Sequence, residues 1–254
     1  MNMSQFQLNG RVALVTGGSK GLGLAMARQL AQAGADVLIC SRHAEELKAA
    51  HDLIVEGTSQ KCQWKVADVS RREDVRDLAQ WALNAFGRVD ILVNNAGTNK
   101  PQAIDAIDDA VWDEVMEINL HSVMALTRAL VPGMKERRWG RVIHISSIMA
   151  VISKEKRNVY SATKAALLGL CRASAIDLGP FGITVNCLAP GPFLTDLPAS
   201  VLSEQEKKSF SDHTALGRWG HPDELTGPLL LLASEAGRYI TGSNLLVDGG
   251  FTIR

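Results

Sequence analysis

The sequence predicts an α/β fold in which a doubly wound, seven-stranded parallel sheet carries helices on both faces. Short runs of Val, Ile and Leu alternate with longer helical patterns along the chain, as in repeated β-α-β units. The runs are continuous rather than mixed with polar residues, which indicates strands buried on both faces. With 254 residues, 46% of them hydrophobic, and no repeat or linker to divide it, the chain is expected to form a single domain over 1–254.

The elements are expected in a regular order along the chain. Strands, recognised by their β-branched apolar runs, are expected near 11–16, 35–40, 62–67, 89–93, 141–146, 182–188 and 244–247. Helices, recognised by longer apolar-periodic segments, are expected near 21–33, 43–56, 71–86, 108–138, 158–178 and 222–235. Segment 192–215, rich in Ser, Lys and Glu between apolar ends, is expected to be a mobile lid over a substrate. Ligands of such sheets bind at the carboxyl ends of the strands.

A glycine-rich turn joins the first strand to the first helix. The strand 11–16 runs directly into GGSKGLG, where Gly17 permits a tight turn, Gly21 lets the backbone approach a pyrophosphate and Gly23 allows the helix to pack closely on the strand. The helix that follows presents free N–H groups and a positive dipole to an anion. The spacing T-G-x-x-x-G-x-G differs from G-x-G-x-x-G, and no Gly-Lys-Ser/Thr follows, so the turn predicts a phosphate site that is not a P-loop.

Three further residues form a candidate catalytic group. Tyr160 and Lys164 are four residues apart in VYSATKAAL and share one face of a helix, and Ser147 follows the strand 141–146. An ammonium group near a phenol favours the phenolate, which brings the pKa of the phenol from about 10 toward neutrality. This combination predicts proton transfer to and from an alcohol or carbonyl oxygen.

Composition excludes several other classes of function. Lys plus Arg and Asp plus Glu both number 27, so the formal charge is zero and nothing favours binding to nucleic acid or to an anionic membrane. The four cysteines have no C-x-x-C spacing and the six histidines no H-x-x-x-H spacing, so we expect reduced thiols and no metal site. No apolar run reaches membrane-spanning length and MNMSQFQLNG does not resemble a signal peptide, so a cytoplasmic location is expected.

Seven motifs in the correct order resemble the short-chain dehydrogenase/reductase family over nearly the whole chain. TGGSKGLG (16–23) is similar to the family's cofactor turn, NNAG (94–97) to the motif after its fourth strand, and Asn119 in EINL to its helix asparagine. Ser147, Tyr160 and Lys164 match its active site, APGPFLT (189–195) its P-G-x-x-x-T segment, and LLVDGG (245–250) its last strand and turn. The resemblance implies a Rossmann fold and an oxidoreductase.

The resemblance also implies a role for each of these residues. Tyr160 would act as general acid in reduction and as base in oxidation, Lys164 would lower the pKa of Tyr160 and hold the nicotinamide ribose, and Ser147 would orient the substrate carbonyl. Asn119 would hold a water molecule that links Lys164 to solvent. Thr195 would hold the carboxamide, and Asp68 with Val69 would contact adenine. The implied cofactor site comprises Gly17, Ser19, Lys20, Gly21, Leu22, Gly23, Ser41, Arg42, Asp68, Val69, Asn95, Ala96, Gly97, Tyr160, Lys164, Pro190, Gly191 and Thr195.

The end of the second strand favours NADP(H) over NAD(H), although NAD(H) stays possible. A carboxylate there would accept the ribose hydroxyls of NAD, but the chain has Cys40, Ser41 and Arg42 instead. Lys20 in the glycine turn adds a second cation within reach of a 2′-phosphate. Glu45 and Glu46 follow a turn later and are not expected to oppose the phosphate. The alternative is that both cations are solvated surface charges.

The predicted substrate loops 98–106, 148–158 and 192–215 carry several cations. Lys100, Lys154, Lys156 and Arg157 favour an anionic substrate, and the alternative is again a solvated loop. Lys154-Glu155 and RWGHPDELTGPLLLLAS (218–234) are similar to segments of gluconate 5-dehydrogenases. The expected activity is therefore interconversion of an alcohol and a ketone on a sugar acid or polyol. The alternatives are a 3-oxoacyl-thioester reductase and a non-catalytic NADP-binding sensor.

Two long predicted helices indicate self-association. The segments 108–138 and 158–178 carry more apolar positions than one face on a sheet requires, which usually marks an interface. In the family that the chain resembles, these two helices pair across a twofold axis. A homotetramer is therefore expected.

Overall fold

The computed structural model describes residues 3–195 and 203–254, which form an α/β fold around one seven-stranded parallel sheet. The strands are β1 (Val12–Thr16), β2 (Asp36–Ser41), β3 (Cys62–Val66), β4 (Ile91–Asn94), β5 (Gly140–Ile145), β6 (Ile183–Pro190) and β7 (Asn244–Val247). Their order is β3-β2-β1-β4-β5-β6-β7, so the winding of the sheet reverses between β1 and β4. The predicted fold class is confirmed, and each predicted strand is present.

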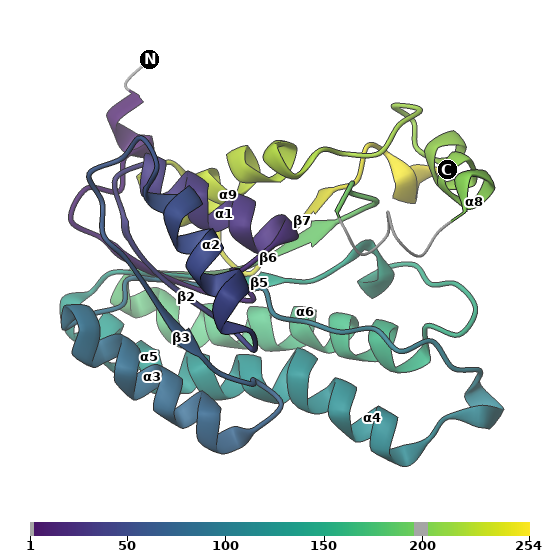
Figure 1. Cartoon of the computed structure of the whole chain (residues 1–254), viewed down its shortest axis with the longest axis horizontal. Helices are drawn as coiled ribbons and strands as arrows, with labels where there is room; N and C mark the ends of the chain where they lie inside the picture. The colour runs from purple at the N-terminus through teal and green to yellow at the C-terminus, as the bar shows by residue number, and fades with distance from the viewer. Residues whose placement is uncertain (1–2, 196–202) are drawn as a thin grey trace.

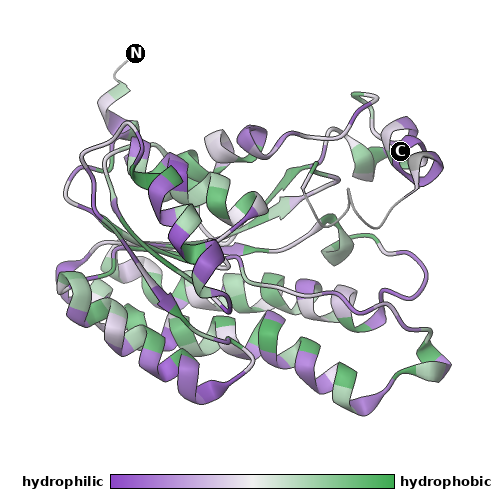
Figure 2. Ribbon diagram, viewed as in Figure 1, coloured by the Kyte–Doolittle hydropathy of each residue, from purple (hydrophilic) through white to green (hydrophobic). Residues whose placement is uncertain are grey.

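Helices cover both faces of the sheet (Figure 1). One layer contains α1 (Gly21–Gln32), α2 (Ala44–Val55) and α9 (Thr226–Ala233), and the other contains α3 (Arg72–Phe86), α5 (Ser122–Arg137) and α6 (Asn158–Leu178). Successive side chains of a strand enter opposite layers: Val15 belongs to the buried cluster that contains Met26 of α1, whereas Leu14 belongs to the cluster that contains Leu78 of α3. The helices carry both hydrophobic and hydrophilic residues, as Figure 2 shows, because one side of each is buried and the other is exposed.

Some elements differ from the sequence prediction. Residues 108–138, predicted as one helix, form α4 (Asp109–Met116), a π-helical turn η3 (Glu117–His121) and α5. Segment 222–235 begins with the 3-10 helix η6 (Pro222–Leu225) before α9. Part of the expected lid 192–215 is helical, because α8 (Glu204–His213) follows a capping box formed by Ser203 and Glu206. Residues 196–202 of that segment lie outside the described residues, so the mobility of the lid stays a prediction.

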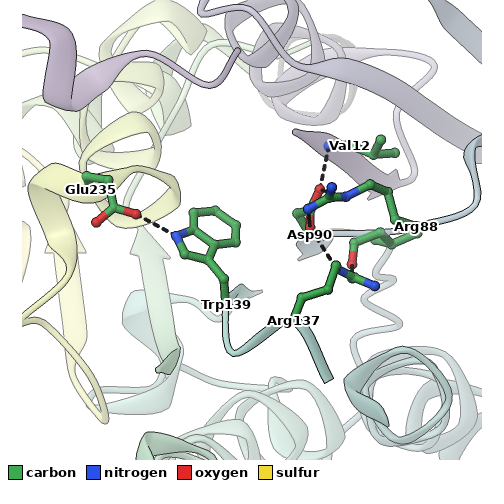
Figure 3. A network of polar contacts seen from close by, with 7 residues as sticks. Val12, Arg88, Asp90, Arg137, Trp139 and Glu235 are labelled. Carbon is green, nitrogen blue, oxygen red and sulfur yellow. Dashed lines mark hydrogen bonds and ion pairs between the residues drawn. The ribbon is translucent and has the colours of Figure 1, made fainter. Parts of the chain in front are cut away.

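A polar network holds the strands together at their amino ends. Its members include Val12, Arg88, Asp90, Arg137, Trp139 and Glu235 (Figure 3). The carboxylate of Asp90 is fully buried, accepts a hydrogen bond of 3.0 Å from the Val12 N–H and pairs with Arg88 at 2.7 Å. A buried carboxylate is stabilised only when it is paired and hydrogen-bonded in this way. These contacts tie β1 to the start of β4.

Candidate active site

The glycine turn after β1 is held in place by the turn after β4. Gly17 adopts a φ of +64°, and a Cβ on Gly23 would lie 2.1 Å from the carbonyl oxygen of Gly17, so neither position accepts a side chain without rearrangement. The side-chain amide of Asn95 donates hydrogen bonds to the carbonyl oxygens of Thr16 (2.8 Å) and Gly17 (3.1 Å). The N–H groups of Asn95 and Ala96 donate to the Thr16 hydroxyl at 3.0 Å each. The turn is therefore fixed at the point where the winding of the sheet reverses.

A cleft of about 530 Å³ opens beside this turn. Most of the predicted cofactor residues line it: Gly17, Ser19, Lys20, Gly21, Leu22, Gly23, Ser41, Arg42, Asp68, Val69, Asn95, Ala96, Gly97 and Thr195. Four predicted residues do not, namely Tyr160, Lys164, Pro190 and Gly191. Sequence reasoning missed other lining residues, which are Cys40, His43, Glu46, Ala67, Thr98, Glu114 and Ile118.

Pro190 and Gly191 lie instead at the end of β6, against the turn that follows β7. The Gly191 N–H donates to the carbonyl oxygen of Val247 at 2.9 Å. A Cβ on Gly191 would lie 2.6 Å from the Cα of Asp248, so the glycine allows the two turns to approach. This contact places the chain before Thr195, and Thr195 faces Gly21, where a Cβ would lie 3.5 Å from the Thr195 methyl carbon.

The predicted cations at the mouth of β2 lie as expected, but Glu46 does not. Lys20 and the exposed Arg42 both line the cleft. The carboxylate of Glu46 reaches back from the first turn of α2, pairs with the Lys20 ammonium at 3.0 Å and accepts a hydrogen bond of 3.0 Å from the Ser19 hydroxyl. The start of α2 therefore packs beside the glycine turn, so Glu46 does not lie clear of Lys20 as expected; its effect on a bound phosphate stays a prediction. A glutamate in the first turn after β2 was the available sequence signal.

Asp68 organises the turn after β3. Its carboxylate accepts hydrogen bonds from the Ser70 N–H (3.0 Å) and hydroxyl (2.8 Å), and its own N–H donates to the Asp74 carboxylate. This Asp–Ser turn is a local hydrogen-bonded motif common before helices. It leaves Asp68 and Val69 lining the cleft.

Ser147, Tyr160 and Lys164 converge at the carboxyl end of β5. The Lys164 ammonium lies 5.6 Å from the centre of the Tyr160 ring, as their four-residue spacing on α6 predicts. Lys164 is only 4% exposed, and its ammonium donates a hydrogen bond of 2.7 Å to the carbonyl oxygen of Ile145 in β5. The Ser146 hydroxyl donates to the carbonyl oxygen of Lys164 at 3.1 Å, which ties α6 to the end of β5. Ser147 is buried and hydrogen-bonded with Tyr160.

Burial dominates the electrostatics of this group. It raises the pKa of Tyr160, while a hydrogen bond with Ser147 and the positive charge of Arg157 act to lower it. Burial also lowers the pKa of Lys164 to about 8. The structure therefore corrects the expectation that Lys164 brings the pKa of Tyr160 down: Arg157 is the cation whose charge acts on the phenol.

Asn119 connects the turn after β4 to α6. Its side-chain amide donates to the Thr98 carbonyl oxygen (2.9 Å) and the Thr163 hydroxyl (3.1 Å), and its side-chain oxygen accepts from the Thr98 N–H (2.8 Å). Asn119 lies within the π-helical turn η3, where the Ser122 N–H bonds to the Glu117 carbonyl oxygen. Such turns inside α-helices occur frequently at functional sites. The proposed water at Asn119 stays a prediction.

All four cysteines are free and buried. Within residues 3–195 and 203–254, no group of three or more His, Cys, Asp or Glu side chains is arranged to hold a metal ion. The helices in these same ranges include none that is long and apolar enough to cross a membrane.

A glycine cradle at the switch point of a parallel sheet, with a tyrosine, a lysine and a serine at the neighbouring strand end, defines a nucleotide-dependent oxidoreductase. Similarity to known proteins identifies the family: the chain belongs to the short-chain dehydrogenase/reductase family, whose members act on CH–OH groups with NAD(P). A family model described as Enoyl-(Acyl carrier protein) reductase matches residues 17–252.

Relatives with different substrates are equally similar to this chain. It is 35% identical to a 3-oxoacyl-(acyl-carrier-protein) reductase of Aquifex aeolicus, over 97% of this chain and 99% of that protein. It is 34% identical to a gluconate 5-dehydrogenase of Gluconobacter oxydans, over 98% and 97% of the two chains. A solved gluconate 5-dehydrogenase of Burkholderia cenocepacia in complex with NADP and tartrate superposes with a TM-score of 0.93, at 35% identity and with full coverage of both chains.

Proposed function

We propose that this protein is an NADP(H)-dependent oxidoreductase that interconverts a secondary alcohol and a ketone of a sugar acid or polyol. The convergence of Ser147, Tyr160 and Lys164 at the end of β5 carries the proposal. In ketone reduction Tyr160 donates a proton to the carbonyl oxygen, and Ser147 orients that oxygen with a hydrogen bond. In alcohol oxidation the same phenol, deprotonated, accepts the hydroxyl proton.

The cleft suits a nicotinamide dinucleotide, which supplies or takes up the hydride when it is bound. The glycine turn has no side chain at Gly17, Gly21 or Gly23 that would keep a pyrophosphate from its backbone. The Lys164 ammonium lies close to Gly97, where a Cβ would be 3.4 Å from it. In our proposal Lys164 holds the nicotinamide ribose, Thr195 the carboxamide and Asp68 with Val69 the adenine. Ser41 and Arg42 meet a 2′-phosphate, for which a guanidinium has a matching fork of donors.

The cations near the active site support an anionic substrate, although not all are available to it. Lys100 is paired with Glu114, and the Lys154 ammonium lies 4.9 Å from the centre of the Phe210 ring. Arg157 is half-buried and acts electrostatically on Tyr160. We propose that Arg157 attracts the carboxylate of a sugar acid toward the phenol. The tartrate in the Burkholderia cenocepacia structure, itself a hydroxy acid, is consistent with this class.

A 3-oxoacyl-thioester reductase is the second candidate, because the Aquifex aeolicus relative is as similar as the gluconate 5-dehydrogenases. Assays of keto-sugar acids, polyols and acetoacetyl thioesters with NADPH and with NADH distinguish the two. The proposal predicts the highest kcat/KM for a keto-sugar acid with NADPH. A thioester preferred over every sugar acid and polyol would overturn the substrate assignment, and preference for NADH would overturn the cofactor assignment.

A further inference from the structure

We propose that Glu46 is a specificity-determining residue, whose carboxylate competes with the 2′-phosphate of NADP for Lys20 and Ser19 and so limits the preference for NADP over NAD. The inference rests on the proposed function, because it concerns the same nucleotide site. It concerns a residue that is absent from the set of cofactor-site residues predicted from the sequence but lines the cleft.

The geometry places the carboxylate where a phosphate would bind. One oxygen of Glu46 lies 3.0 Å from the Lys20 ammonium, and the other accepts the Ser19 hydroxyl at 3.0 Å. Both partners belong to the glycine turn between β1 and α1, whereas Glu46 belongs to α2. The carboxylate therefore engages two donors of the glycine turn, and all three residues line the same cleft as Arg42.

Charge makes the competition selective. The hydrogen bond from Lys20 is the main cause that lowers the pKa of Glu46, so the carboxylate is ionised at neutral pH. A phosphate monoester carries about −1.5 to −2 charges at that pH. Bringing it to Lys20 therefore sets like charges side by side or displaces Glu46 from its partners. The 2′-hydroxyl of NAD is neutral and can donate a hydrogen bond to the same carboxylate.

Stability does not account for the contact. The Lys20 and Glu46 side chains are 63% and 35% exposed, and ion pairs at such sites contribute little to folding. Removing the charge of Glu46 is therefore expected to leave the fold intact and to act on ligand binding. Glu45 is the matched control, since it is exposed and lies in the same first turn of α2. In the part of the chain that the structure describes, it is Glu46 and not Glu45 that bonds to Ser19 and Lys20.

The test is calorimetric titration of the wild-type protein, Glu46→Gln and Glu45→Gln with NADP⁺ and with NAD⁺, without substrate. Because an exposed ion pair is worth up to about 1 kcal/mol and 1.4 kcal/mol is tenfold in affinity, Glu46→Gln is expected to tighten NADP⁺ binding by roughly threefold to fivefold. Its affinity for NAD⁺ is expected to stay level or to weaken. Glu45→Gln is expected to keep the wild-type ratio of the two affinities.

A second variant checks that the effect passes through Lys20. In a Lys20→Met background, Glu46→Gln is expected to change the NADP⁺/NAD⁺ ratio less than in the wild-type background. An unchanged ratio in Glu46→Gln, weaker NADP⁺ binding, or an equal shift in Glu45→Gln would overturn the inference while leaving the proposed function standing. A wild-type protein that binds neither dinucleotide would overturn the proposed function and the inference together.

Discussion

Asn94 on β4 and His144 on β5 are paired across the sheet, and the Asn94 amide nitrogen lies 3.1 Å from the His144 Nδ1. Both side chains are buried, yet the side-chain oxygen of Asn94 and the Nε2 of His144 have no hydrogen-bond partner among the described residues. Burial, aided by the charge of Lys164, lowers the pKa of His144 to about 4. A neutral histidine therefore lies beneath the active site.

This histidine is expected to make stability depend on pH on the acid side. Its pKa is about 4 in the fold against an ordinary 6.5, so between these values the unfolded chain binds the extra proton. Stability therefore falls as the pH falls from 6.5 toward 4, by up to about 3 kcal/mol from this group. Urea unfolding across this range should show a smaller loss in His144→Asn or His144→Gln than in the wild type. Equal losses in all three proteins would contradict the assignment.

The raised pKa of Tyr160 predicts different pH profiles for the two directions of the reaction. The phenol stays protonated at neutral pH, so ketone reduction has its acid available there. Alcohol oxidation needs the phenolate, so its kcat is expected to rise with pH from about 7 to 10. Steady-state rates in both directions measure this, and an oxidation rate independent of pH would contradict it.

Arg157→Gln is the companion variant for that measurement. Loss of the positive charge that lowers the pKa of Tyr160 is expected to move the rise in oxidation rate to higher pH. Lys156→Gln removes a neighbouring exposed charge that does not contribute to the pKa of Tyr160, and is expected to leave the profile in place.

Arg42→Asp is expected to invert the cofactor preference. The change removes a cation from the 2′-phosphate and adds a carboxylate that the ribose hydroxyls of NAD can use. A hydrogen bond to an ionised partner is worth about 1.5–3 kcal/mol, so the KM for NADPH should rise by roughly tenfold or more. The KM for NADH should fall, because the new carboxylate can accept hydrogen bonds from the ribose hydroxyls. Two results together would contradict this role: equal efficiency of the wild-type protein with both cofactors, and no change in either KM on substitution. Arg42 would then be a solvated surface charge.

We also predict a homotetramer assembled through α5 and α6. Both helices carry exposed apolar side chains, with Ile176 77% and Met124 38% exposed, which a partner subunit would cover. Sedimentation velocity at micromolar concentration should show a species of four chains. A monomer as the main species would reject the prediction.

The fold was predictable because its signals are local. Buried strands appear as continuous apolar runs, and the glycine spacing after β1 marks the position of the turn. The Tyr160–Lys164 geometry follows from helix periodicity alone. Helix α8 could also have been predicted, since Ser203 and Glu206 have the spacing of a capping box.

Where the structure differs from the sequence prediction, the cause is mostly packing or contact between segments that are distant in the sequence. Glu46 meets Lys20 across 26 residues of sequence, and only the packing of α2 beside the glycine turn brings them together. The pKa of Tyr160 is raised because of burial, and the four-residue spacing of Tyr160 and Lys164 does not predict how deeply the phenol is buried. The π-helical turn at 117–121 has no distinct apolar period, so it reads as part of one long helix.

Loss of the Tyr160 hydroxyl tests the acid–base role most directly. Tyr160→Phe keeps the ring but removes the proton, whereas Lys164→Ala is expected to impair both NADPH binding and turnover. The measurement is kcat for ketone reduction together with the Kd for NADPH in Tyr160→Phe. We expect kcat to fall by about 10²–10⁴-fold while the Kd stays near the wild-type value. A Tyr160→Phe protein that retains most of the wild-type kcat would contradict the proposed mechanism.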